Sequence, residues 1–112
     1  MYYYPAEIPH QVTGINVTKN VLGNSPLLTV SWSSPVGSGI TYNVWYSKSY
    51  GSERGPPSGA MNISGISQQV KTLNNLEVGT TYYIWVTAVK NQVQGPYSAR
   101  VSEMTCDGKY TC

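Results

Sequence analysis

The sequence has few of the residues that acid–base, metal and redox chemistry require. It contains one histidine, His10, and charged residues make up only 11% of its 112 residues, against about 25% in an average soluble protein. No pair of carboxylates is spaced for acid–base work, and no Cys/His set has the spacing of metal ligands. We therefore predict that the chain is not an enzyme and that it holds no cofactor or metal.

Clustered basic residues and long apolar runs are also missing. The seven Lys and Arg residues are scattered along the chain and leave a net charge of +2, whereas nucleic-acid-binding proteins gather such residues to neutralise phosphates. No apolar run approaches the about 20 residues that a membrane-spanning helix needs, and no signal peptide is present. We expect no nucleic-acid partner and no insertion into a membrane, and we expect the chain to be a segment of a longer protein.

Short segments in which apolar and polar residues alternate fill most of the chain. Alternation with period two is the pattern of strands with one buried face, and turn residues separate the segments. No segment shows the i, i+3, i+4, i+7 spacing of an amphipathic helix. The seven predicted strands lie at about 12–18, 28–33, 40–47, 61–66, 70–73, 82–89 and 98–105. This arrangement predicts an all-β sandwich or a small barrel.

Three sequence features resemble those of a fibronectin type III domain. Trp32 followed by Pro35 resembles the end of the second strand in that family, and residues 42–46 resemble its Tyr-x-Val-x-Tyr third strand. The most specific feature is the segment Leu76–Tyr82, which resembles Leu-x-Pro-Gly-Thr-x-Tyr and continues into alternating apolar residues. The resemblance implies a seven-stranded antiparallel Greek-key β-sandwich of immunoglobulin-like architecture. It divides the chain into a lead-in at 1–8, the domain at 9–105 and a tail at 106–112.

The segment from Leu76 to Tyr82 also has a direct physical interpretation. Gly79 permits a sharp reversal of the chain, and Tyr82 can bury its ring while its hydroxyl bonds to backbone a few residues upstream, which is a tyrosine corner. Val78 stands where the family usually has proline. On the preceding strand, Lys71 falls on the position expected to face inward, and we therefore expect a bulge or a one-residue shift there.

The outer face of the third, sixth and seventh predicted strands is the first candidate binding surface. If the residues on either side point into the core, Trp45, Tyr83 and Trp85 point outward, and Arg100 can form a cation–π contact with them. Exposed aromatic residues beside arginine resemble interface hot spots, although cross-strand packing that shields the sheet would give the same pattern. The long loop at 48–59 is the second candidate, with a solvated spacer loop as its alternative.

The remaining features concern the cellular compartment. Asn16 and Asn62 begin two N-glycosylation sequons. We expect Cys106 and Cys112 to form a local disulfide, although pairing with neighbouring domains is a second possibility. Together these features favour an extracellular or cell-surface location.

The family resemblance implies a module without catalytic activity that contacts a protein partner or neighbouring domains. We expect an interaction or spacer domain of a cell-surface receptor, adhesion protein or matrix protein, monomeric in isolation. The alternative is an accessory domain of a secreted multidomain enzyme.

Overall fold

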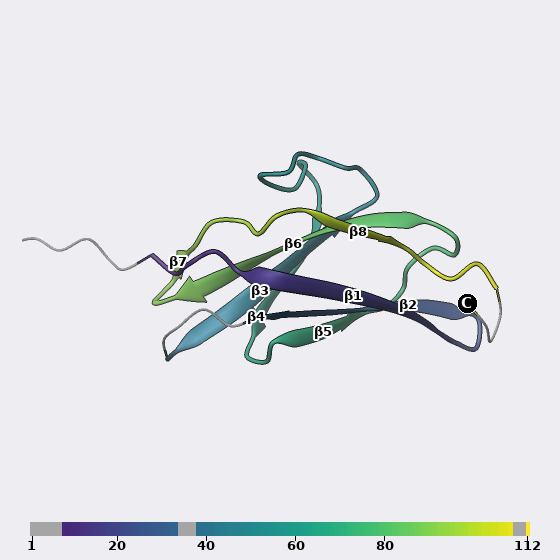
Figure 1. Cartoon of the computed structure of the whole chain (residues 1–112), viewed down its shortest axis with the longest axis horizontal. Helices are drawn as coiled ribbons and strands as arrows, with labels where there is room; N and C mark the ends of the chain where they lie inside the picture. The colour runs from purple at the N-terminus through teal and green to yellow at the C-terminus, as the bar shows by residue number, and fades with distance from the viewer. Residues whose placement is uncertain (1–7, 34–37, 109–111) are drawn as a thin grey trace, which may run out of the picture.

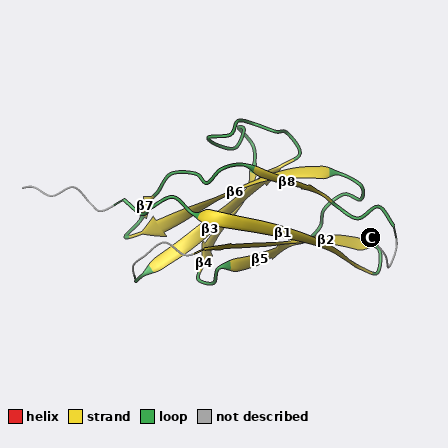
Figure 2. Cartoon of the chain, viewed as in Figure 1, coloured by secondary structure: helices red, strands yellow, loops and turns green. Residues whose placement is uncertain are grey.

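Eight β-strands and no helix make up the described part of the chain (Figures 1 and 2). The computed structural model describes residues 8–33, 38–108 and 112. The strands are β1 Thr13–Leu22, β2 Ser25–Ser33, β3 Ile40–Ser47, β4 Met61–Ile66, β5 Val70–Leu73, β6 Thr81–Lys90, β7 Val93–Gln94 and β8 Val101–Met104. The expectations for Pro35 and for the lead-in up to residue 7 lie outside the described residues.

The strands form two antiparallel sheets that face each other. One sheet has the order β1-β2-β5, and the other has the order β4-β3-β6, with β7 and β8 both paired to β6. The prediction of an antiparallel β-sandwich is confirmed, with β7 as one strand more than the seven predicted. This strand has only two residues, and it follows a turn in which Asn91 and Gln92 have φ values of 50° and 66°. A strand of that length is too short to produce an alternating pattern.

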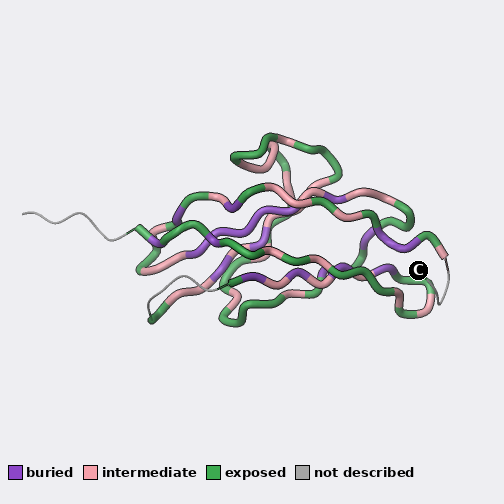
Figure 3. The backbone as a smooth tube through the Cα atoms, viewed as in Figure 1, coloured by how far each residue is buried: buried purple, intermediate pink, exposed green. Residues whose placement is uncertain are grey.

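Inward-facing residues of β2, β3 and β6 form the core between the sheets (Figure 3). Trp32 of β2 packs edge-on against Tyr42 of β3, with 5.3 Å between ring centroids. The fully enclosed aliphatic residues of these strands are Leu28, Val30, Val44, Ile84, Val86 and Ala88. Burial of each large apolar side chain contributes roughly 1.5–3 kcal/mol. The alternation in the sequence therefore reflects a core built on alternate residues.

The predicted bulge in β5 is not present. Leu73 pairs with Leu28 and Lys71 pairs with Val30 in an uninterrupted register, so Lys71 does lie on the inward side of its strand. The prediction of a bulge or shift was wrong because β5 is the edge strand of its sheet. At an edge, the aliphatic stem of a lysine can cover the core while its ammonium group reaches solvent.

Candidate functional site

The outer face of the five-stranded sheet brings the predicted aromatic residues together. Trp45 of β3 pairs directly with Trp85 of β6, and Ser47 pairs with Tyr83. Because side chains alternate along each strand, these three aromatic residues lie on the side of the sheet that faces away from the core. The sequence therefore assigned them to the correct face.

Trp85, however, is not exposed on this face. Its exposed fraction is 0%, and its Nε1 donates a hydrogen bond to the carbonyl oxygen of Ser52 at 3.1 Å. Ser52 belongs to the loop at 48–60, which lies over β6 and β8 in Figure 1. The prediction that Trp85 forms part of a binding surface was wrong, because the long loop after β3 covers its indole ring.

That loop keeps its position through a tight turn of its own. Ser52 and Gly55 exchange backbone hydrogen bonds of 3.1 and 3.3 Å. Gly51 has a φ of +56°, and a Cβ at that position would lie 2.8 Å from Cδ of Pro57, so a larger residue would be both strained and crowded. The loop is thus an ordered segment that covers the outer face of the sheet. The sequence analysis considered a binding loop or a solvated spacer loop for 48–59 and did not predict this covering role.

Trp45 is partly covered by the segment that connects β7 to β8. The ring of Tyr97 lies edge-on to the indole, with 5.6 Å between centroids. Trp45 Nε1 donates to the hydroxyl of Thr87 at 3.3 Å, and Thr87 donates to Gln94 at the same distance. Trp45 therefore belongs to a packed polar and aromatic layer rather than to a free surface.

Arg100 lies against one of the three predicted aromatic residues, Tyr83, and against Tyr50, which the sequence did not predict. Its guanidinium carbon is 5.6 Å from the ring centroid of Tyr83 and 5.9 Å from that of Tyr50. Nη1 also donates a hydrogen bond to the carbonyl oxygen of Tyr50 at 2.9 Å. These three residues, which we call the Tyr50 cluster, join the 48–60 loop to β6 and to the segment before β8.

Sequence reasoning missed Tyr50, the most exposed member of the cluster. Its exposed fraction is 66%, and its ring lies 6.2 Å from that of Tyr83 in a T-shaped arrangement. Tyr50 stands in a loop rich in Ser, Gly and Pro, where no periodicity assigns a direction to a side chain. A single bulky aromatic residue in such a loop was the only available signal.

The tyrosine corner has the geometry expected from the sequence. The Tyr82 hydroxyl accepts a hydrogen bond from the backbone N–H of Glu77 at 2.9 Å. Leu76 is buried, and Gly79 has a φ of +55°. Val78, at the position where proline is usual, is 57% exposed, so its side chain is not needed to hold the turn.

Two titratable groups beside this corner have shifted pKa values. Burial raises the pKa of Tyr46 above its ordinary value, and the neighbouring Tyr82 adds to this effect. The pKa of the Lys48 ammonium is also raised, first by its hydrogen bond to Glu77 and second by the charge of that carboxylate. Both shifts favour the protonated form in the folded state.

The described residues show no other arrangement typical of a catalytic or metal site. Within 8–33, 38–108 and 112, no three His, Cys, Asp or Glu side chains come together in a way that could hold a metal ion. In the same residues, no helix is long and apolar enough to cross a membrane.

Comparison with known families shows which family of β-sandwich domains the chain belongs to. The fibronectin type III domain model matches residues 10–104, which is most of the chain. The chain belongs to the fibronectin type III family. No match was found among curated proteins.

Several solved structures share the fold. The chicken CNTN1 fragment FN1–FN3 is 26% identical over 91% of this chain, with a TM-score of 0.67, and the match covers 33% of that fragment. The domain of human fibronectin type III domain containing protein 3 is 21% identical, with coverages of 94% and 93% and a TM-score of 0.67. Domains d3–d4 of the rat CD45 extracellular region are 19% identical, with coverages of 89% and 51% and a TM-score of 0.66.

Both predicted sequon asparagines are exposed on this fibronectin type III domain, one on each outer face. Asn16 pairs with Ser31 on the three-stranded sheet, and Asn62 pairs with Trp45 on the five-stranded sheet. The domain also has a disulfide between Cys106 and Cys112, whose Cα atoms are 4.6 Å apart. The disulfide follows the last strand, which rules out an inter-sheet bridge of the immunoglobulin type.

Proposed function

We propose that this fibronectin type III domain is a non-catalytic, extracellular protein-interaction module that contacts its partner through the Tyr50 cluster. The observation that carries the proposal is the position of the Arg100 guanidinium, held against Tyr50 and Tyr83 and anchored by a hydrogen bond to the Tyr50 carbonyl. Tyr and Arg are enriched among interface residues that supply most of the binding free energy. A side chain already held in one place loses little conformational entropy when a partner binds.

The exposure of Tyr50 supports a role beyond fastening the loop. A tyrosine that served only to hold the loop would bury most of its ring, whereas this one is 66% exposed. On the same face, the buried Trp85 and the partly buried Trp45 are each held by a hydrogen bond and supply a rigid base for the cluster. The cluster therefore combines an accessible aromatic ring with a fixed cation.

A binding screen with matched variants tests this proposal. The chain would be screened against a panel of purified cell-surface and secreted ectodomains, and each binder would be remeasured with Tyr50→Ser and Arg100→Gln. We expect at least about a tenfold loss of affinity with either variant, which corresponds to about 1.4 kcal/mol. Val78→Ser, a change at a similarly exposed residue outside the cluster, is the control and should bind as the unmodified chain does.

Two outcomes would contradict the proposal. Binders that are insensitive to both cluster variants would place the contact surface elsewhere. Faster proteolysis of the 48–60 loop in Arg100→Gln, with unchanged binding, would show that the cluster only fastens the loop.

The extracellular location rests on separate observations. Asn16 and Asn62 are both exposed, as an acceptor for a glycan must be, and disulfides persist in oxidising compartments. The similarity to domains of the CD45 extracellular region agrees with this location. Peptide mapping of protein secreted from a eukaryotic host should find glycans at both asparagines; unmodified asparagine at both sites would count against secretion.

A further inference from the structure

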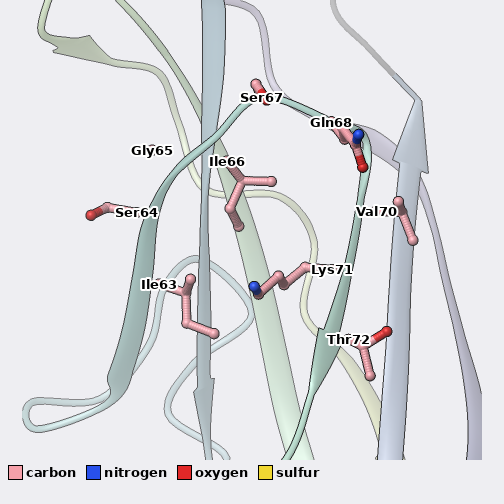
Figure 4. Close-up of a pocket in the computed structure, with 9 residues that line it drawn as sticks. All are labelled: Ile63, Ser64, Gly65, Ile66, Ser67, Gln68, Val70, Lys71 and Thr72. Carbon is pink, nitrogen blue, oxygen red and sulfur yellow. The ribbon is translucent and has the colours of Figure 1, made fainter.

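A groove lies between the edge strands of the two sheets, on a different surface from the Tyr50 cluster. β5 ends the three-stranded sheet and β4 ends the five-stranded sheet, so within the part of the chain that the structure describes each has one edge that pairs with no other strand. The groove between them has a volume of about 550 Å³. Figure 4 shows Ile63, Ile66 and Lys71 pointing into this space from the two sides, whereas Ser64 points away.

Lys71 is the unusual residue of this groove. It pairs with Val30 on the inward side of its strand, where an apolar residue is typical. Among the described residues, its ammonium group has neither a hydrogen bond nor an ion pair. None of the residues that line the groove is acidic, and Glu77 and Glu103 pair with Lys48 and Lys19 elsewhere.

The position of Lys71 gives the groove a defined chemistry. Ile63 and Ile66 supply apolar surface on the β4 side, and the lysine supplies one positive charge on the β5 side. A charge in a partly apolar groove is attracted to a carboxylate more strongly than a fully solvated charge is. A ligand that fits this groove therefore has an apolar part and a carboxylate.

The two edges differ in their ability to accept another strand. The pairing of β4 shifts between Tyr42 and Val44, and Gly65 in that part of β4 has a φ of +71°, which is typical of a bulge that interrupts pairing. β5 pairs with β2 in a regular register over all four of its residues. Its free edge can thus form backbone hydrogen bonds with an added strand.

We propose that this groove binds an extended peptide segment that pairs with the free edge of β5 and places an Asp or Glu side chain against Lys71. Apolar side chains two residues away on the same face of the peptide contact Ile63 and Ile66, because side chains alternate along an extended strand. Backbone pairing supplies most of the affinity, and the carboxylate selects the register.

A titration with two matched peptides tests the inference. The ¹⁵N-labelled 112-residue chain is titrated with acetyl-Thr-Thr-Val-Thr-Glu-Thr-Val-Thr-Thr-amide, which has Val two residues before and two residues after the Glu on the same face, and with the same peptide carrying Gln in place of Glu. We expect saturable amide shifts at 63–72 with the Glu peptide and at least about a tenfold weaker affinity with the Gln peptide. Binding to the Glu peptide should weaken further as salt is added.

Variants at position 71 separate binding from folding. Lys71→Met should lower the affinity of the chain for the Glu peptide by about tenfold or more, while Lys71→Arg should retain most of that affinity. Lys71→Met places an apolar side chain at an inward position, so its unfolding midpoint in urea should equal or exceed that of the unmodified chain. Arg54→Gln removes the same charge from the exposed loop and should bind the Glu peptide normally.

The rival explanation is that Lys71 only prevents unwanted pairing of the β5 edge. In that case neither peptide would shift residues 63–72, and Lys71→Met would self-associate in sedimentation velocity while the unmodified chain stayed monomeric. That result would overturn the proposal, as would equal binding of the Glu and Gln peptides. The Tyr50 cluster variants should leave peptide binding unchanged, so the two proposals fail independently.

Discussion

The hydroxyl of Tyr82 accepts a hydrogen bond from the backbone amide of Glu77, five residues earlier in the chain and 2.9 Å away. This bond closes the turn that carries the chain from β5 to β6. Thr105 reinforces the same turn, because its hydroxyl donates to the Glu77 carbonyl at 2.6 Å and accepts from the Thr80 amide at 2.9 Å. The corner therefore fixes the segment that follows β8 as well as the start of β6.

Removal of the Tyr82 hydroxyl should destabilise the domain without changing its fold. Tyr82→Phe leaves the Glu77 amide without its acceptor, and we expect the free energy of unfolding to fall by about 1–3 kcal/mol in urea titrations. Tyr46→Phe is the matched control, because the Tyr46 ring lies 6.2 Å from that of Tyr82 but its hydroxyl bonds to no described residue. Equal losses in the two variants would show that the corner bond contributes nothing specific.

Trp85 should behave as a core residue in spite of its place on the outer face. Trp85→Ser removes a side chain with 0% exposure and opens a cavity beneath the 48–60 loop, so we expect a loss of about 3–5 kcal/mol. Tyr50→Ser, at a 66% exposed residue of the covering loop, should change stability by no more than about 1 kcal/mol. Thermal unfolding followed by circular dichroism compares the two; a mild effect of Trp85→Ser would mean that the loop does not bury it.

Alkaline pH should weaken the folded state through Tyr46 and Lys48. Both pKa values are raised above their ordinary values of 10.0 and 10.5, so the native state holds these protons more tightly than the unfolded state does. The stabilisation is complete below the ordinary pKa values and is lost as pH rises through the raised ones.

Unfolding in urea between pH 8 and 12 measures this loss. The slope of stability against pH should be smaller in Tyr46→Phe and in Lys48→Gln than in the unmodified chain. High salt should reduce only the Lys48 contribution, because that ion pair is exposed. Identical slopes in all three proteins would show that neither group is coupled to folding.

The disulfide should stabilise the tail rather than the sandwich. Cys106 and Cys112 close a loop with a sequence separation of six, for which the chain-entropy model gives only about 2 kcal/mol. Cys106 is buried, and its carbonyl oxygen accepts a hydrogen bond from Gly79 at 3.2 Å, so the corner holds one end of the loop. Reduced protein should therefore remain folded, with a small decrease in its unfolding midpoint.

Mass spectrometry after alkylation checks the pairing itself. Non-reduced protein should take up no alkylating agent, and reduced protein should take up two groups. Cys112→Ser should reproduce the stability of the reduced protein while preserving the buried Cys106 side chain. Two modified thiols in non-reduced protein would rule out the local bridge.

The period of the sequence was sufficient to assign most side chains to a face of a sheet. Tyr42 and Val44 point inward and Trp45 points outward because successive side chains of a strand alternate, whatever the rest of the fold does. The same rule placed Tyr83 and Trp85 on one face. It also gave Lys71 an inward position, which we had replaced with a bulge that the structure does not contain. The sequence also predicted the tyrosine corner, because the turn at Gly79 and the hydrogen bond of Tyr82 both lie within the seven-residue segment from Leu76 to Tyr82.

Alternation could not reveal what covers a face. Tyr83 and Trp85 have the same sequence pattern, yet only Trp85 is fully buried, because the 48–60 loop folds back over it and Ser52 accepts its N–H hydrogen. The path of that loop depends on contacts with residues such as Arg100, 50 positions away from Tyr50. No local pattern encodes a contact of that separation.

The sequence by itself determined seven of the eight described strands, their inward and outward faces and the tyrosine corner, since these depend on neighbours within a few residues. Only the tertiary structure decided which outward aromatic residues meet solvent, and that the Lys71 charge lies in an open groove rather than at a bulge. Both depend on which segments pack beside a strand and on whether that strand lies at a sheet edge. For that reason the candidate binding surface on the outer face is now the Tyr50 cluster alone, and the groove beside β5 is a second candidate surface.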